Sequence, residues 1–560
     1  MTFDPVRSAF APPGDALRET ASYRPRSTTP RLANLQATKP RTVTALVGLT
    51  LAICVTLLGL AYRLAPVPSK ALEYFEAAWR LPQGTGADHD SLQYGLIVPI
   101  WLAQRVFGYS QAAYLVVPLL AGALLAVSVY LIGFLLFNRV VGIAAALLAV
   151  GNSIMFDQLT QPLPDLLATS LLCAALVLVI AIRQRRLVVT ATRRRQTLAL
   201  AATGVLLGWS FLSKALVVFC WPLIPLLLWR RISARRAVWI VAPVALVTFG
   251  ELCWNALTVG DALGRFQALM AYDGTQGGSV HSAVPETVRA DAEFVALDRQ
   301  WDVTQPATAL GAAPEGLWLK IGLLATAIGV MVDRRLAFLA GWATAYTLPV
   351  IALGDQLGED TPAVRLTEQH QWLPLVPAMA LSASAGVWLV AHNRSRVVRW
   401  LREYAHVVAA CVTVAMVAIP IGIAQHARMT GHDESDSTAS EDTTQRARQL
   451  EELRTWLADH AGGVETLWAP RQTWRLVRVF ANGTYGGRIW PGHLKLWEPA
   501  TSRPQPADGD YVVFYGPYSR TCAPCRADAE ALLGRPPVAP PTWQPAFVSR
   551  ERIVEIYQVR

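Results

Sequence analysis

Residues 165–212 read DLLATSLLCAALVLVIAIRQRRLVVTATRRRQTLALAATGVLLGWSFL, two apolar stretches on either side of an arginine-rich gap. Each stretch approaches the length that a helix needs to cross a bilayer core, about 20 apolar residues. Lys and Arg collect in short loops on the cytoplasmic side of a membrane. The pattern therefore predicts two membrane-spanning helices joined by a cytoplasmic loop.

The same alternation extends over residues 42–425, where arginines fill every second gap between apolar stretches. About eleven stretches have spanning character, by the rule of about 20 apolar residues, and they lie near 42–63, 112–137, 140–156, 165–182, 196–212, 215–229, 237–258, 316–332, 336–353, 372–391 and 405–425. The arginine clusters at 183–195, 230–236, 334–335 and 394–402 all fall on one side if the N-terminus is cytoplasmic. The sequence thus predicts an α-helical polytopic protein of the cell membrane whose C-terminal region is extracytoplasmic.

Composition agrees with a membrane protein that carries one soluble domain. The chain of 560 residues is 53% hydrophobic and only 16% charged, which is typical of a polytopic protein rather than a wholly soluble one. Its net charge of +10 could indicate a nucleic-acid partner. However, the excess lies in loops that flank the membrane, where topology already explains it. We therefore expect the lipid bilayer, and no nucleic acid, as a partner.

The chain divides into four predicted parts. Residues 1–41 form a basic cytoplasmic tail that we expect to be disordered, and 42–425 form the membrane domain, with outer loops at 64–111, 259–315 and 354–371. An acidic linker at 426–445 leads to an extracytoplasmic α/β domain at 446–560. Helical periodicity at 446–460 and strand patterns at 464–470, 510–516 and 552–559 support that domain. In the first outer loop, 71–81 predicts an amphipathic helix and 96–107 a helix lying at the membrane interface.

Ionisable side chains are costly in or beside a bilayer, so their positions indicate where function lies. The predicted topology brings one set to the outer face: Glu73, Glu76, Asp88, His89, Asp90, Asp157, Asp165, Lys214, Glu251, Arg365, Glu368 and His370. Such a set suits a lipid-linked substrate that carries a phosphate. A cation can pair with the phosphate, and a carboxylate can take the proton of an attacking hydroxyl.

Each of these residues also has a structural interpretation. Asp165 follows a Pro-rich turn and could cap the helix that it begins. Glu73 and Glu76 could form the solvated face of an amphipathic helix, and Lys214 could extend to the membrane interface. The functional interpretation therefore rests on their predicted co-location rather than on any single residue.

The outer domain contains a CAPC motif, Cys522 and Cys525, which we interpret as a local disulfide because the domain is predicted to lie outside the cytoplasm. We find no dinucleotide fingerprint, P-loop or zinc-type Cys/His spacing. The sequence therefore indicates no cofactor and no metal site, and it leaves open whether a divalent metal is needed.

The segments EYFEAAWRLP, QPLPDLLATSLL, GWSFLSKALVVFCWPLIPLLLW and QWLPLVPAMAL resemble, as a series, the GT-C glycosyltransferases that use polyprenyl-phosphate sugars. That group includes protein O-mannosyltransferases and lipid A aminoarabinose transferases. The resemblance covers 42–425 and implies a GT-C-like membrane core. It implies a polyprenyl-phosphate-linked sugar donor and inverting transfer to an acceptor on the outer face, with a role in the cell envelope. It also points to Asp165 and Lys214 as site residues.

The chain departs from the family pattern in the first outer loop. The family has an Asp a few residues before a Tyr, and Lys70 stands about where that Asp is expected before Tyr74. We therefore expect Glu73, Glu76 and Asp165 as catalytic residues. The expected substrate-binding residues are Lys70, Asp88, His89, Asp90, Lys214, Glu251, Arg365 and His370.

Two other functions compete with this hypothesis. A catalytically inactive relative that serves as a scaffold would explain Lys70. A lipid or solute transporter would favour ionisable groups near the membrane midplane and related halves, and the sequence shows neither.

Overall fold

The computed structural model describes residues 30–61, 66, 70–83, 93–184, 192–229, 231–258, 260–265, 334–353, 369–392, 438–460, 462–498, 505–516, 523–550 and 552–560. Met1–Val47 and Gly48–Arg560 form two separate compact units. Helix α1, Pro30–Ala61, runs across the boundary between them and begins inside the segment that we expected to be a disordered tail.

Six described helices are long and apolar enough to cross a membrane: Thr42–Ala61 within α1, Gln111–Leu136 (α4), Pro164–Gln184 (α7), Arg193–Ser213 (α8), Ala234–Thr258 (α10) and Trp372–Leu389, which includes most of α17 (Val376–His392). These helices coincide with six of the predicted stretches. The described chain is thus mostly helical and has the multi-pass character that the sequence predicted.

Five predicted stretches remain, and three of them contain described helices. Helix α5, Arg139–Val150, has only 12 residues. The stretch 215–229 is split into η4, Ala215–Cys220, and α9, Leu223–Leu228, because Pro222 has no N–H with which to continue the helix. Helix α15, Arg334–Leu353, covers 336–353. The stretches 316–332 and 405–425 lie outside the described residues, so the count of eleven stays a prediction.

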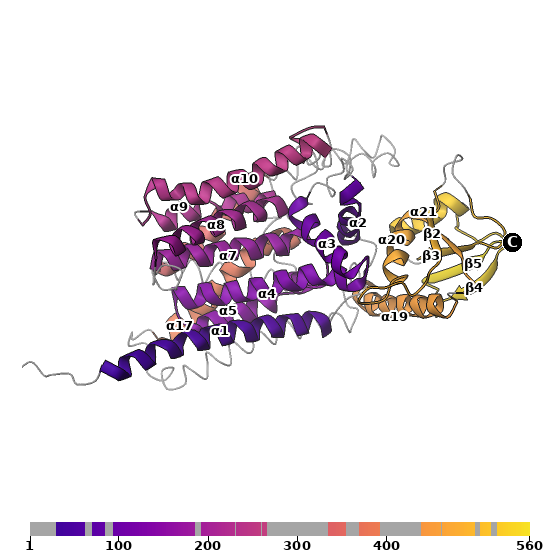
Figure 1. Cartoon of the computed structure of the whole chain (residues 1–560). Coiled ribbons are helices and arrows are strands. Elements are labelled where there is room, and N and C mark those ends of the chain that lie inside the picture. The colour runs from indigo at the N-terminus through magenta and orange to yellow at the C-terminus, as the bar shows by residue number, and fades with distance from the viewer. Residues whose placement is uncertain are drawn as a thin grey trace, which may run out of the picture. The chain divides into compact units, whose positions relative to one another are not determined.

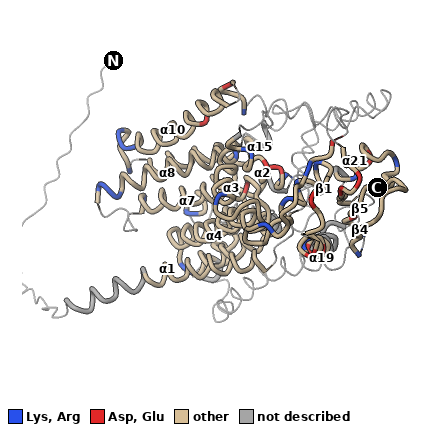
Figure 2. Tube along the Cα trace, turned by 45° about the vertical axis from the view of Figure 1, so that its right-hand side comes forward, with Lys and Arg blue, Asp and Glu red and all other residues tan. Residues whose placement is uncertain are grey.

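The long helices pack side by side in a bundle (Figure 1). Helix α7 packs between α4 and α8, α10 covers α8, and α5 packs between α4 and α17. Figure 2 shows Lys and Arg at the ends of α7, α8 and α10 that face away from α2. The other end of the bundle carries the short helices α2, Lys70–Arg80, and α3, Tyr94–Phe107, which the sequence predicted as 71–81 and 96–107.

The C-terminal region forms a five-stranded sheet with the strand order β2-β1-β3-β5-β4. Its elements are α19 (Thr438–Asp459), β1 (Thr466–Ala469), α20 (Arg471–Phe480), β2 (His493–Leu496), β3 (Tyr511–Tyr515), α21 (Ala523–Leu533), β4 (Gln544–Val548) and β5 (Val554–Gln558). Strand β1 is parallel to β2 and β3, whereas β5 is antiparallel to β3 and β4. Helix α19 begins inside the predicted acidic linker.

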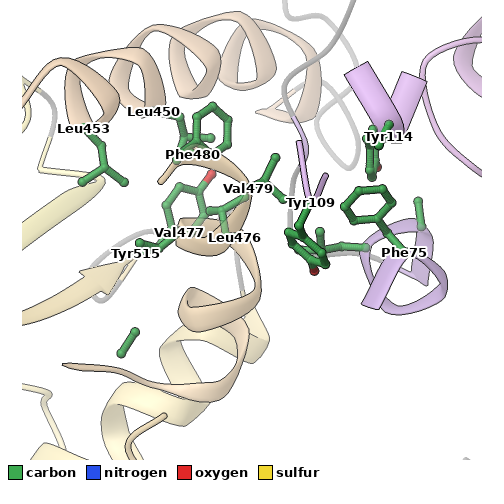
Figure 3. Packing of buried hydrophobic residues seen from close by; sticks show 14 of the residues in the cluster. Phe75, Tyr109, Tyr114, Leu450, Leu453, Leu476, Val477, Val479, Phe480 and Tyr515 are labelled. Atoms are coloured by element: carbon green, nitrogen blue, oxygen red, sulfur yellow. The ribbon is translucent and has the colours of Figure 1, made fainter. Parts of the chain in front are cut away.

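One hydrophobic cluster joins the C-terminal region to the bundle. It contains Phe75, Tyr109 and Tyr114 from α2 and the segment around the start of α4, and Leu450 and Phe480 from α19 and α20. Figure 3 shows this packing from close by. Residues 48–560 form a single compact unit. The cluster therefore fixes the C-terminal region against the end of the bundle that carries α2 and α3.

Candidate functional site

The first feature of the site is an ion pair between Asp165 and Lys214. Asp165 lies in the first turn of α7, and Lys214 is the residue at which α8 ends. Their side chains are 2% and 16% exposed. A carboxylate in the first turn of a helix is also favoured by the helix dipole. The structure thus brings together two of the predicted site residues and pairs the buried Asp165 carboxylate with the half-buried Lys214.

Neighbouring hydrogen bonds position this pair. Gln158 Oε1 accepts from the backbone N–H of Leu166 at 3.0 Å, so Gln158 supplies the cap that we considered for Asp165. Ser210 Oγ donates to the carbonyl oxygen of Ala168 at 2.7 Å and ties α8 to α7. The Lys214 ammonium group donates to the Asp165 carboxylate. The described structure thus assigns the capping of α7 to Gln158 and pairs Lys214 with Asp165.

Helix α3 approaches the pair closely. Trp209 Nε1 donates to the carbonyl oxygen of Gly95 at 2.9 Å. A Cβ atom at Gly95 would lie 2.3 Å from the backbone nitrogen of Ser213, so only glycine fits there. Leu163 and Leu167, on either side of Asp165 in the chain, pack against the hydrophobic cluster that holds α2. The first outer loop and the Asp165–Lys214 pair consequently share one end of the bundle.

A second buried ion pair lies near the end of α10. Arg265 Nη1 donates to Glu251 Oε1 at 2.8 Å, and both side chains are buried. Arg265 Nη2 donates to the carbonyl oxygen of Phe211 at 3.1 Å, and the guanidinium lies 5.5 Å from the centre of the Phe211 ring. The pair fixes the chain after α10 to the end of α8, close to Lys214 in the sequence. Sequence reasoning singled out Glu251 and missed Arg265, because no local pattern links residues separated by a loop.

The third feature lies between α2 and α20. Arg475 Nη1 donates to Glu73 Oε1 at 2.8 Å, and Arg475 Nε forms an ion pair with Glu76. Glu76 also pairs with Arg80 on its own helix. The Glu73 side chain is 33% exposed, whereas that of Glu76 is 4% exposed. The interpretation of the acids as a solvated helix face is therefore wrong for Glu76, which is buried between two arginines.

The charge of Arg475 is strongly favoured at this position. Burial opposes the charged guanidinium, but the carboxylates of Glu76 and Glu73 outweigh it, so the pKa of Arg475 lies above its usual range. Sequence reasoning did not predict α20. Its arginines at 471, 475 and 478 follow a helical spacing and alternate with the buried Leu476, Val477, Val479 and Phe480, which is a signal that could have revealed it.

The other predicted site residues are less informative. Lys70 is the exposed first residue of α2, one turn before Tyr74. Six of them lie outside the described residues: Asp88, His89, Asp90, Arg365, Glu368 and Cys522. The side chains of Asp157 and His370 are not described. Cys525 is buried and disulfide-bonded. In the described part of the chain, no group of three or more His, Cys, Asp or Glu side chains could hold a metal ion.

The sequence of residues 98–254 matches the family model of the dolichyl-phosphate-mannose-protein mannosyltransferases. That segment contains Asp165, Lys214 and Glu251. The resemblance to protein mannosyltransferases that the sequence predicted is therefore confirmed over this part of the chain. No curated protein matches the chain significantly.

Two solved structures are similar to the chain. ArnT from Cupriavidus metallidurans, solved with undecaprenyl phosphate bound, is 13% identical over 93% of this chain and 98% of its own, with a TM-score of 0.49. The oligosaccharyltransferase of Archaeoglobus fulgidus, solved with zinc and sulfate, is 13% identical over 79% of this chain, with a TM-score of 0.43. The match spans 62% of the length of the archaeal enzyme.

Proposed function

We propose that this protein is a membrane glycosyltransferase that moves a sugar from a polyprenyl-phosphate donor to an acceptor hydroxyl. The observation that carries the proposal is the buried Asp165–Lys214 pair, which lies inside the segment that matches the mannosyltransferase family. A half-buried cation paired with a buried carboxylate at one end of a membrane bundle suits a substrate with an anionic head and an apolar tail. The donor's lipid chain would lie among the helices.

Lys214 would bind the donor phosphate, and Asp165 would orient its ammonium group. The acceptor oxygen would attack the anomeric carbon of the sugar on the face opposite the phosphate. The bond from that carbon to the phosphate oxygen breaks, a bond to the acceptor oxygen forms, and the configuration inverts. The electron pair leaves with the polyprenyl phosphate, whose developing charge Lys214 stabilises.

The proton of the acceptor hydroxyl requires a carboxylate base within reach. Of the two carboxylates on α2, Glu73 is the better candidate because a third of its side chain is exposed, whereas Glu76 is enclosed by Arg475 and Arg80. Lys70 at the start of α2 would contribute to donor binding. Glu251 supports the site through Arg265, with which it pairs beside α8.

The proposed site faces the outside of the cell membrane, where a cell-envelope glycan or glycolipid would be the acceptor. The Lys and Arg residues at the other ends of α7, α8 and α10 favour this orientation. A single Cys introduced at Arg194, which is exposed, should resist a membrane-impermeant thiol reagent in intact cells and react after permeabilisation. A Cys at the exposed Tyr485 should react in intact cells. The reverse labelling pattern would contradict the orientation.

The activity itself is tested with the full-length protein in lipid nanodiscs and a panel of polyprenyl-phosphate hexoses and pentoses. We expect release of polyprenyl phosphate by the parent and its loss in Lys214→Met, with Lys495→Met as a lysine control on strand β2. Binding of undecaprenyl phosphate should weaken only in Lys214→Met. A folded parent that turns over no donor in the panel would contradict the proposal and favour the inactive scaffold. Solute uptake into vesicles without donor cleavage would favour the transporter.

A further inference from the structure

The contact between α20 and α2 joins residues 402 positions apart in the chain, which is the separation of Arg475 and Glu73. Arg475 lies between two carboxylates of α2, and its own side chain is 10% exposed. A planar guanidinium that bonds two carboxylates fixes their direction as well as their charge. The ion pair that the structure describes for Glu73 is therefore made by a residue of the C-terminal region.

A second arginine of α20 strengthens the same contact. The Arg478 guanidinium lies 4.8 Å from the centre of the Trp79 ring on α2, 4.5 Å from that of Tyr109 and 5.0 Å from that of Trp474. Burial raises the pKa of Tyr109 well above its usual range, more than the nearby Arg478 lowers it. The phenol thus stays neutral, and Arg478 meets it as a cation over an aromatic face.

Backbone contacts beside the two arginines hold α20 in place. Asn482 Nδ2 donates to the carbonyl oxygen of Tyr109 at 2.9 Å, and the Ala112 N–H donates to the carbonyl oxygen of Thr484 at 2.9 Å. Gly486 has φ = +105°, and a Cβ atom there would lie 2.7 Å from the carbonyl oxygen of Phe107. Only glycine allows both that conformation and that approach. Together with the hydrophobic cluster, these contacts describe a fixed interface.

We propose that Arg475 is a positioning residue for sugar transfer, through which the C-terminal region holds Glu73 of α2 at the reacting centre. This inference rests on the proposed function. Arg475 need not touch the donor or the acceptor, because it acts through the carboxylate that it holds. Misplacement of a catalytic group by about 1 Å can lower a rate by about 10²-fold. Loss of Arg475 should accordingly lower turnover while leaving the donor phosphate site at Lys214 intact.

The test compares Arg475→Gln, Arg475→Lys and Arg471→Gln in the full-length protein in nanodiscs. Arg471 is exposed on the same helix and serves as the matched control. We expect kcat to fall about 10- to 100-fold in Arg475→Gln, by the cost of misplacement, with unchanged binding of undecaprenyl phosphate. Arg475→Lys, which keeps the charge, should recover part of kcat. Arg471→Gln should behave like the parent.

Gly486→Ala provides a second test that leaves every charge in place. It should loosen the interface, and kcat should fall while undecaprenyl phosphate binding stays at the parent value. If the Arg475 variants fold and turn over donor like the parent, or if Arg475→Gln turns over donor faster, the inference is overturned and the proposed function stands. If the parent cleaves no donor, the proposed function fails and this inference fails with it.

Discussion

Two of the charged centres in the described part of the chain are built in different ways. The Asp165–Lys214 pair is internal to the bundle and joins residues 49 positions apart on neighbouring helices. The Glu73–Glu76–Arg475 group joins a short helix of the first outer loop to a helix near the C-terminus. Each centre pairs at least one buried carboxylate with a cation, yet only the first draws both partners from the segment that matches the mannosyltransferase family.

From this difference we expect the bundle pair to act in sugar transfer and the interface group to position Glu73. Removing one partner of a buried pair leaves an uncompensated charge, so the cost of each change depends on what else can neutralise it. Asp165 has Lys214 as its ion-pair partner in the described part of the chain, whereas Glu76 has both Arg475 and Arg80. The bundle pair should therefore tolerate change less well than the interface group.

The largest effect is expected at the bundle pair. Asp165→Asn keeps the shape of the side chain but removes the charge that orients Lys214, and we expect turnover to fall by about 10² or more, in the range for a group that supports proton and charge transfer. The fold should persist, since Gln158 rather than Asp165 caps α7. The measurement is donor turnover per folded molecule, with folding followed by thermal unfolding in detergent.

A double variant separates stability from chemistry at this pair. Lys214→Met alone should destabilise the protein by about 3–5 kcal/mol, the usual cost of leaving a buried charge unpaired. Asp165→Asn with Lys214→Met should regain most of that stability and stay inactive. If Asp165→Asn turned over donor at the parent rate, the pair would be structural. The two centres would then not differ in the way that we expect.

The second buried pair of the bundle, Glu251–Arg265, should show a mainly structural effect. Glu251→Gln leaves the buried Arg265 without its carboxylate, and we expect a loss of about 3 kcal/mol in unfolding free energy. Turnover per folded molecule should fall less than in Asp165→Asn. The matched control is Asp261→Asn, because Asp261 lies between the two partners in the chain and bonds the Leu263 N–H, which Asn can also do. The pair would prove functional rather than structural if Glu251→Gln kept its stability but lost turnover as fully as Asp165→Asn.

Much of the bundle could be predicted from the sequence, because apolar length and arginine placement are local signals. Such signals or the family resemblance predicted six spans, the helices at 71–81 and 96–107, and the site residues Asp165 and Lys214, although not that these two residues pair. The broken segment at 215–229 was less predictable, since its composition is apolar throughout and only its two prolines, Pro222 and Pro225, mark the interruption.

The interface could not be predicted, because it depends on contacts between distant parts of the chain. The pattern of Glu73, Glu76 and Arg80 on α2 indicates a charged face, but only the packing of α20 shows what covers it. The edge strands β2 and β4 were also missed. Both are largely exposed or half-buried, so they lack the apolar runs that revealed β1, β3 and β5.

The interface acids should divide into one functional and one structural residue. Glu73→Gln is expected to lower turnover about tenfold or more, as for loss of a general base, with little change in stability because Glu73 is a third exposed. Glu76→Gln should chiefly lower stability, since it leaves Arg475 and Arg80 with a weaker partner. Turnover and thermal unfolding of the two variants, measured side by side, give the comparison. Turnover at the parent rate in both variants would place the base elsewhere.

The smallest effect is expected from the cysteines of the C-terminal region. Cys525 is disulfide-bonded, and a bridge to Cys522 would close a loop of only a few residues. Such a short loop restricts the unfolded chain little, so Cys522→Ser with Cys525→Ser should cost about 2 kcal/mol at most. Cys525 belongs to the hydrophobic cluster that also holds α20, and the lost stability should appear as faster proteolysis of the C-terminal region.

The Asp165–Lys214 pair lies in the bundle and does not depend on that bridge, so donor turnover at low temperature should match the parent. A double Ser variant whose C-terminal region resists proteolysis like the parent, yet which no longer turns over donor, would show that the cysteines take part in the chemistry.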